Sequence, residues 1–334
     1  MSTGALTDSE FPAMHAMKNS VPFGRNSLRG PLRLAPLGLF AIASYANAQA
    51  DWTLVRADTL VTAIHATSVY SAQTGQRFSQ DDIVESSGNG VVQIQDESGN
   101  IVALGRDTRA MLTRDSHIAL LRGWLKVMHM CANAACATPV IETERTRITP
   151  ADRTALVIAA TPEGYDSADA VFCESGSAQV HSLGKTRGKP LDVHLDAHQS
   201  AFARHAGTVE PVSFAASPEA AFVTAMPLTF RDALRPLPVP TPPSPNAAHT
   251  LPAHGVRPVA FADIADWLGS SFAARTDPTT RFSERFRPRL SDTAFRRDVK
   301  QHIRALPDWH VLIFPPPRPT LKPLAAYSST TARP

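Results

Sequence analysis

Short runs of β-favouring residues recur between positions 51 and 205, and they constrain the fold more than any other feature of this chain. Each run is rich in Val, Ile, Thr and Leu, alternates with polar residues and stops at Gly, Asn, Asp or Pro, as strands do. In the run 90–96, for example, Val92 and Ile94 fall on one face and Gln93 on the other. Runs this short and regularly spaced predict a mainly β fold, an antiparallel β sandwich or a rolled sheet, rather than βαβ units.

Three glycines stand where these runs are expected to turn. The segment 96–100 has the composition of a hairpin turn, in which Gly99 is free to adopt a positive φ. Gly123 lies inside the run 121–128, and Gly176 follows Glu174-Ser175 in a turn. We therefore expect Gly99, Gly123 and Gly176 to be structural turn residues.

The order of these runs resembles the FecR domain, a periplasmic module named after the ferric-citrate regulator. The segments that carry the resemblance are 78–84, the hairpin 96–101, the Leu-Arg-Gly-Trp-Leu strand 121–125, the turn and strand 174–180, and the closing segment 195–201. This chain departs from the family pattern at two positions. Asp81 replaces the first glycine of the pattern, and His198 replaces the glycine before Gln199. The resemblance covers roughly residues 70–205 and implies a sensing or binding module of the free-standing secreted type, without the cytoplasmic sigma-factor-binding arm.

The amino-terminal segment has the pattern of a secretory signal. Arg25, Arg29 and Arg33 precede an apolar run, 34–43, and then a stretch of small residues, 44–50. A basic stretch, a short apolar run and a small-x-small site are typical of a signal peptide. We expect residues 1–48 to be removed after Ala48, with Ala50 as the alternative, and the mature chain to be periplasmic and not membrane-spanning. An uncleaved single span is the competing interpretation, although the run is shorter than the about 20 residues that a span requires.

Composition divides the remainder into a β domain (51–205), an irregular, Pro-rich linker (206–258), a small helical module (259–318) and a disordered tail (319–334). The linker region holds eight of the 28 prolines between positions 235 and 258. Such a segment favours extended polyproline II, so we expect a disordered tether or a semi-rigid spacer, with a docking ligand for a partner groove as the alternative. The segment 218–234 is expected to hold a short helix broken by Pro227.

The tail carries helical periodicity. Apolar residues at 261, 264, 265 and 268 share one helical stripe, and Ser291-Asp292 can cap a second helix that buries Phe295, Val299 and Ile303. Pro307 is expected to end that second helix. Helices this short cannot form a large core alone, so the tail is expected to dock on the sheet, on a partner or on itself.

Basic residues concentrate in this tail. A possible patch for an anionic partner comprises Arg285, Arg287, Arg289, Arg296, Arg297, Lys300 and Arg304. A solvated face with local ion pairs is the alternative interpretation. The chain as a whole has 33 Lys and Arg against 30 Asp and Glu, a formal net charge of +3, which is too small for a chain-wide hold on nucleic acid.

The three cysteines suggest one local disulfide. Cys131 and Cys136 flank turn residues, and in an oxidising compartment they are expected to pair, leaving Cys173 free and buried in a strand. Their spacing is not Cys-x-x-Cys, which disfavours a redox-active pair. His194, Asp196 and His198 would share one face of a strand and form a weak candidate for a metal site, although a solvent-facing polar stripe is the simpler interpretation.

No nucleophile elbow, phosphate loop, zinc-protease motif or dinucleotide fingerprint occurs. We therefore expect no catalytic residues, no metal and no cofactor, and a protein that is not an enzyme. The first hypothesis is a periplasmic ligand- or protein-binding module of FecR type in signalling or envelope sensing. The alternative is a structural or glycan-associated scaffold of the cell envelope. The expected partner is an envelope protein or a glycan, and not nucleic acid.

Overall fold

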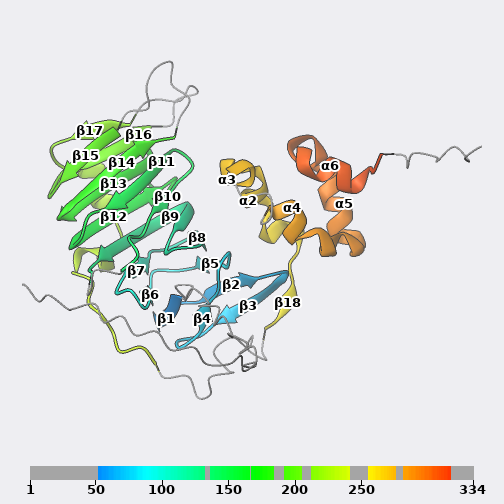
Figure 1. Ribbon diagram of the computed structural model, residues 1–334, viewed down its shortest axis with the longest axis horizontal. Coiled ribbons are helices and arrows are strands. Elements are labelled where there is room, and N and C mark those ends of the chain that lie inside the picture. The colour runs from blue at the N-terminus through cyan, green and yellow to red at the C-terminus, as the bar shows by residue number, and fades with distance from the viewer. Residues whose placement is uncertain are drawn as a thin grey trace, which may run out of the picture. The chain divides into compact units, whose positions relative to one another are not determined.

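Antiparallel strands form most of the structure, a computed structural model that describes residues 52–131, 136–165, 167–183, 192–204, 212–240, 255–275 and 281–316 (Figure 1). The predicted signal peptide and the predicted tail 319–334 lie outside the described residues. Within the described ranges, no helix is long and apolar enough to cross a membrane.

The strands form two sheets. The first has the order β4-β1-β6-β7-β9-β12-β13-β16-β17 and the second the order β18-β3-β2-β5-β8-β9-β10-β11-β14-β15. In chain order the strands are β1 (Trp52–Ala57), β2 (Val61–His65), β3 (Ser68–Ala72), β4 (Arg77–Phe78), β5 (Ile83–Ser86), β6 (Val92–Gln95), β7 (Ile101–Leu104), β8 (Thr108–Leu112), β9 (Ile118–His129), β10 (Ile141–Glu142), β11 (Thr146–Pro150), β12 (Thr154–Ala160), β13 (Ser167–Ser175), β14 (Ser177–Ser182), β15 (Asp192–Asp196), β16 (Ser200–Arg204), β17 (Ser213–Ala215) and β18 (Arg257–Pro258). Neighbouring strands are antiparallel except β9 and β10, which are parallel.

Strand β9 belongs to both sheets and turns from one to the other at Gly123. Its first residues pair with β8 and β10 in the second sheet, and those from Gly123 onward pair with β7 and β12 in the first. Gly123 has a φ of +94°, and a Cβ there would lie 2.5 Å from the Cα of Thr108. A glycine is therefore required at this crossing. The shared strand confirms the expected mainly β fold and identifies it as a rolled sheet of short strands.

A second crossing repeats the same construction at Gly176, between β13 in the first sheet and β14 in the second. Gly176 has a φ of +76°, and a Cβ there would lie 2.8 Å from the Cα of Thr154. At both crossings a threonine hydroxyl bonds the main chain just after the glycine. Thr108 donates to the carbonyl of Trp124 (3.0 Å) and accepts from its N–H (2.9 Å), and Thr154 does the same with Ser177 (2.9 and 3.1 Å).

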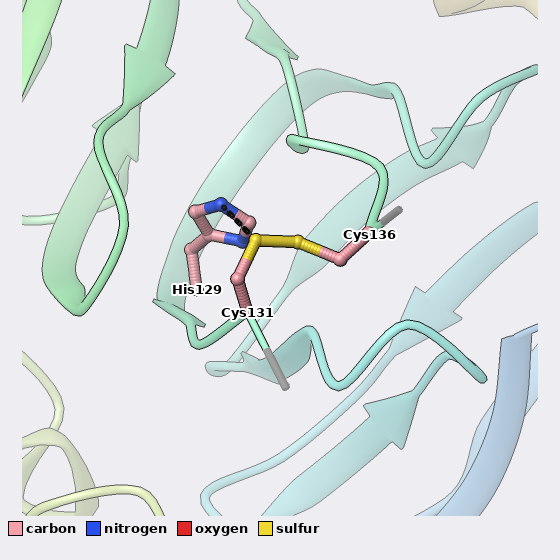
Figure 2. Close-up of side chains that lie close together, drawn as sticks. All are labelled: His129, Cys131 and Cys136. Atoms are coloured by element: carbon pink, nitrogen blue, oxygen red, sulfur yellow. Dashed lines mark hydrogen bonds between the residues drawn. A yellow bond between two sulfur atoms is a disulfide. The ribbon is translucent and has the colours of Figure 1, made fainter. Parts of the chain in front are cut away.

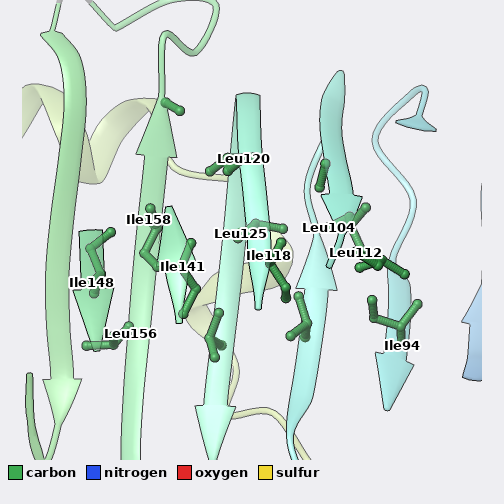
Figure 3. Close-up of a cluster of buried hydrophobic side chains, with 14 of the residues drawn as sticks. Ile94, Leu104, Leu112, Ile118, Leu120, Leu125, Ile141, Ile148, Leu156 and Ile158 are labelled. Carbon is green, nitrogen blue, oxygen red and sulfur yellow. The ribbon is translucent and has the colours of Figure 1, made fainter. Parts of the chain in front are cut away.

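The main core lies between the two sheets, where inward-facing residues of alternating strands meet (Figure 3). The first sheet contributes Ile94, Leu104, Leu125, Leu156 and Ile158, and the second contributes Leu112, Ile118, Leu120, Ile141 and Ile148. This alternation is what the sequence pattern predicts, because successive side chains of a strand point to opposite faces.

The outer face of the first sheet is covered by the segment that follows β17. Two short helices, α1 (Ala220–Ala225) and η1 (Leu228–Arg231), flank Pro227, as the sequence predicts. Their Phe222 and Phe230 pack on Trp124 and Tyr165 in a second buried cluster. The rolled sheet is therefore buried on this outer face as well as on its inner face.

The Pro-rich segment is docked over part of its length, which the expectation of a disordered tether did not foresee. The side-chain amide of Gln93 donates to the carbonyl of Arg235 (2.9 Å), while Gln95 both donates to the carbonyl of Leu237 (2.8 Å) and accepts from its N–H (2.7 Å). An extended Pro-rich chain leaves its carbonyls without internal partners, so glutamine amides on a sheet can bind them. The prolines from 242 to 252 lie outside the described residues.

The C-terminal module consists of η2 (Phe261–Asp263), α2 (Ala265–Gly269), α3 (Ser271–Arg275), α4 (Phe282–Arg285), η3 (Arg287–Ser291), α5 (Thr293–Gln301), η4 (Ile303–Ala305) and α6 (Pro307–Ile313). Asp292 caps α5 as predicted, accepting hydrogen bonds from the N–H groups of Ala294 (2.9 Å) and Phe295 (3.3 Å). Pro307 does not end α5, which stops at Gln301; it begins α6 instead. Proline suits the first turn of a helix because its missing N–H would have no intrahelical partner there.

This module docks on the outer face of the second sheet. Ile64, Ile83 and Leu121 of that face form one buried cluster with Trp267 and Phe282 of the module. The tail therefore adopts the first of the three expected arrangements, docking on the sheet.

Charged groups join the module and the sheet at the edge of this cluster. Asp266 of α2 pairs with Arg109 and with Arg122 (2.9 Å), and Glu85 of β5 pairs with the same two arginines (3.2 and 3.1 Å). A network of alternating charges of this kind orients α2 on the sheet, because each arginine is held by two carboxylates.

Candidate functional site

A disulfide just beyond the end of β9 lies against a buried histidine (Figure 2). Cys131 and Cys136 are joined, with their Cα atoms 5.6 Å apart, and both residues are half-buried. His129, the last residue of β9, is 1% exposed, and its Nε2 lies 3.7 Å from the Sγ of Cys131. The pairing is the one expected from the sequence; the histidine beside it was not expected.

The orientation of His129 is set by the hairpin 96–100. Nδ1 of His129 lies 2.6 Å from Oδ1 of Asn100, whose Nδ2 donates to Asp96 (2.6 Å) and to the carbonyl of Ala137 (3.0 Å). Because the Asn100 amide nitrogen is committed to these two acceptors, its oxygen faces His129 and accepts the Nδ1 proton. Nε2 is therefore the ring nitrogen that carries no proton, and it lies 3.7 Å from the sulfur of Cys131.

Asp96 holds Asn100 in place and so fixes the hydrogen bond between Asn100 and His129. Its carboxylate is buried and accepts from the N–H groups of Ser98 (2.9 Å) and Asn100 (2.8 Å) and from the hydroxyl of Ser116 (2.7 Å). The positive φ of Gly99, +96°, closes the turn. The hairpin that the sequence predicts as a simple turn thus supports the site. The sequence signal for this supporting role is the pair of polar residues, Asp96 and Asn100, at the two ends of the turn.

The histidine is neutral under ordinary conditions. Burial lowers the pKa of His129, while the carboxylates of Asp152 and Asp96 oppose that shift. Asp152 accepts from the N–H groups of Cys131 and Arg153 (both 2.9 Å), and these hydrogen bonds lower the pKa of Asp152. A neutral imidazole with an unprotonated Nε2 can accept a proton from a thiol, whereas a disulfide sulfur has none to give.

The histidines of β15 do not form the weakly predicted metal site. His194 contacts Asp196 (3.3 Å) and Gln179 (2.8 Å), but His198 lies in the turn after β15 with a φ of +69°. The strand ends at Asp196, so the alternation that would place His198 beside His194 stops there. In the described ranges, the His, Cys, Asp and Glu ligand atoms that converge are those of His129, Cys131 and Cys136. The two sulfurs are joined in the disulfide and are not thiolates, which are the form that binds metals.

Two of the predicted basic residues are used in docking the C-terminal module. Arg285 donates to the carbonyls of Ile64 (3.1 Å), Ala66 (3.1 Å) and Asp81, and burial lowers its pKa. Arg289 donates to the carbonyl of Val259 (2.8 Å) and pairs with Asp292 (2.7 Å). These two side chains are therefore structural and do not belong to a free anionic-partner patch.

The remaining basic residues of the predicted patch are exposed. Arg287 pairs with Glu284 (3.6 Å) and Arg297 with Asp298 (3.3 Å). Arg296, Lys300 and Arg304 follow one another at intervals of four along α5 and η4 and form no ion pair with any residue that the structure describes. We call these last three residues the basic stripe. All three side chains are exposed, whereas the neighbouring Phe295 and Val299 are buried, so the stripe faces outward.

Comparison with known proteins leaves the family open. No protein-family model matches the chain, and no curated protein matches it. Two crystal structures of a putative anti-sigma factor from Parabacteroides distasonis ATCC 8503 are similar to it, with 13% and 14% sequence identity and TM-scores of 0.33 and 0.34. Each alignment covers 42% of this chain and 62% of that chain, so this chain spans less than two thirds of their length.

Proposed function

We propose that the mature chain is an exported, non-enzymatic binding module of FecR type that acts in signalling or sensing in the cell envelope, and that it holds an acidic protein partner on the basic stripe. The observation that carries the proposal is the division of the tail's basic residues. Arg285 donates hydrogen bonds to the sheet and so holds the module in place. Arg296, Lys300 and Arg304 are exposed and have no ion-pair partner among the described residues.

Three exposed cations on a fixed scaffold are suited to recognition. An α-helix rises about 1.5 Å per residue, so Arg296 and Lys300, which are four residues apart in α5, lie about 6 Å from one another along its axis, and Arg304 follows in η4. The stripe is held rigidly, because α5 is capped by Asp292 and the module is anchored to the sheet by Arg285. Positive side chains in a fixed row attract an acidic surface and accelerate its association.

The exported location rests on the sequence pattern of residues 25–50 and fits the disulfide, since disulfides persist in oxidising compartments. Expression of the whole chain followed by cell fractionation and N-terminal mass analysis tests it. We expect a periplasmic product that begins at Gln49 or, in the alternative, at Asp51. A full-length product in the cytoplasm would contradict the location.

Binding is tested by charge reversal rather than by deletion, because removing the module would expose the apolar face of the second sheet. The variant R296E/K300E/R304E is compared with R56E/R114E/R231E, which reverses three exposed arginines outside the module. Cross-linking in the envelope fraction with mass spectrometry identifies the bound protein, and surface plasmon resonance then measures its affinity.

We expect the reversal of the stripe to weaken binding of that partner at least tenfold and to remove its dependence on salt, while the control variant keeps both. Equal affinity for the two variants would contradict the proposal. Loss of binding to an anionic polysaccharide with no protein partner would favour the alternative, a glycan-associated scaffold.

A further inference from the structure

We propose that Cys131–Cys136 is a thiol–disulfide exchange site, in which His129 shares the proton of the Cys131 sulfur when the bond opens and closes. The reacting partner is a dithiol. This chemistry is stoichiometric, and it is separate from the binding function proposed for the basic stripe.

The first argument is that the unprotonated nitrogen of the imidazole lies near the sulfur. Nδ1 of His129 donates a hydrogen bond to Oδ1 of Asn100, so Nε2 carries no proton, and Nε2 lies 3.7 Å from Cys131 Sγ. In the disulfide the sulfur offers no hydrogen to this nitrogen. After reduction Nε2 can accept the proton of Cys131 and hold the resulting thiolate in a charge-assisted hydrogen bond, so the reduced form gains an interaction that the oxidised form lacks.

The second argument is that this histidine keeps its place when the disulfide opens. His129 pairs with Thr154 of β12 within the sheet, and Asn100 is held by Asp96, which is held in turn by Ser116. None of these contacts involves either cysteine; the other acceptor of the Asn100 amide, the carbonyl of Ala137, adjoins Cys136, so the hydrogen bond to Asp96 is the one that holds Asn100 independently of the disulfide. The proton acceptor is therefore preorganised in both redox states.

The third argument is access. Cys131 and Cys136 are both half-buried, whereas Cys173 is 0% exposed, and burial raises the pKa of its thiol to about 11. The thiol of Cys173 is therefore inert in the core, whereas a reductant can reach the disulfide between Cys131 and Cys136.

The exchange proceeds in two displacements. One thiolate of the dithiol attacks Sγ of Cys136, the Cys131–Cys136 bond breaks, and Cys131 leaves as a thiolate that takes up a proton shared with Nε2 of His129. The second thiol of the dithiol then displaces Cys136 from the mixed disulfide. The dithiol loses two electrons and becomes a disulfide, and its two protons end on the two cysteine sulfurs. In the reverse direction Nε2 accepts the Cys131 proton and leaves a thiolate as the nucleophile.

Three charged groups act on this proton. Asp152 lies at the N–H of Cys131 and Asp96 lies behind Asn100, and both carboxylates favour a protonated His129. Arg153 is adjacent to Asp152 and exposed, so it partly offsets that carboxylate. Burial opposes the imidazolium. Burial is the larger effect, and the two carboxylates offset part of its cost when the proton moves from Cys131 to His129.

The test isolates Cys131 in the chain C136S and measures its alkylation by iodoacetamide as a function of pH, with peptide mass spectrometry to read Cys131 alone. The comparison is C136S/H129N, because an asparagine amide can still donate to Asn100 but offers nothing at the Nε2 position. The control pair is C131S and C131S/H129N, in which Cys136 is the free thiol.

We expect the apparent pKa of Cys131 to be at least one unit lower with His129 than with asparagine, and Cys136 to be unaffected. In the otherwise unaltered chain, equilibration with dithiothreitol redox buffers should show that H129N shifts the thiol–disulfide equilibrium about tenfold toward the disulfide. For a two-electron couple this lowers the reduction potential by about 30 mV. H129L, which also has no acceptor at the Nε2 position, provides the same two measurements if H129N does not fold. Identical pH profiles and identical redox equilibria with and without His129 would overturn the proposal.

Discussion

The ammonium group of Lys126 donates a 2.6 Å hydrogen bond to the carbonyl oxygen of Phe230, 104 residues further along the chain. Lys126 also donates to the carbonyl of Asp232 (3.0 Å) and pairs with Glu174 (2.6 Å), and its side chain is 1% exposed. A buried charge this well surrounded by acceptors fastens the segment after Pro227 to the outer face of the first sheet.

Replacing Lys126 with Met should lower the free energy of unfolding by about 2–3 kcal/mol, because the carbonyls of Phe230 and Asp232 and the half-buried Glu174 would lose their partner. Urea unfolding measures the change. K300M, at an exposed lysine in the same chain, should shift stability by less than about 0.5 kcal/mol. Similar values for the two variants would show that Lys126 does not fasten the segment.

Substitution of Gly123 by Ala should cost about 3 kcal/mol, since the alanine would hold a φ of +94° and its Cβ would collide with Thr108. Gly269, at the end of α2, is the matched control, because a Cβ there meets nothing within 4 Å. Calorimetry should therefore show a large fall in Tm for G123A and an unchanged or slightly raised Tm for G269A. A neutral G123A would mean that β9 can cross between the sheets in another way.

Asp169 should make stability depend on pH between about 4 and 6. Burial raises the pKa of this carboxyl to about 6 from 3.8, against the hydrogen bond from Thr143 (2.6 Å). The folded chain then binds this proton more tightly than the unfolded chain, so the free energy of unfolding falls as pH rises through that window. The contribution is about 3 kcal/mol in all, at 1.36 kcal/mol per unit.

The variant D169N removes this titration and keeps an oxygen that can accept from Thr143. Urea unfolding at pH 4, 5, 6 and 7 gives the difference in stability between the parent chain and D169N. We expect that difference to change in favour of D169N as pH rises from 4 to 6 and to stay constant above 7. A flat difference over the whole range would contradict the assignment.

Loss of Arg285 should release the C-terminal module from the sheet. R285M removes the hydrogen bonds to the carbonyls of Ile64, Ala66 and Asp81, and we expect a loss of about 3 kcal/mol. Trypsin should then cleave between 287 and 304 much faster than in the parent chain. R287M removes an exposed arginine two residues further along the chain, at the start of η3, and should leave the cleavage rate unchanged. Equal rates in both variants would refute the anchoring role.

Local patterns predicted the elements well. The alternation around Val92 and Ile94 identifies β6, Asp292 marks the start of α5, and the spacing of Cys131 and Cys136 anticipates their pairing. Each of these depends on residues within a few positions of one another, because side-chain alternation, capping and short-loop closure are local physical effects.

The polar residues on the outer face of the first sheet show what local patterns cannot predict. Gln93, Gln95 and Lys126 alternate with apolar residues and so indicate a solvated face, yet all three are buried. Their carbonyl partners come from residues 230–237, and no short-range signal in the chain links them. Arg285 was assigned to a free basic patch for the same reason.

The amino-acid sequence was sufficient to establish strand-forming runs, turn glycines, helix starts and a disulfide, because these follow from the preferences of neighbouring residues. The tertiary structure decided which polar groups meet across long separations. His129 faces Cys131 because the pairing of β7 with β9 sets Ile101 opposite Met128 and brings Asn100 to the imidazole. Register between strands depends on the burial of a whole face, so a histidine at a strand end becomes part of a site only when the sheet is assembled.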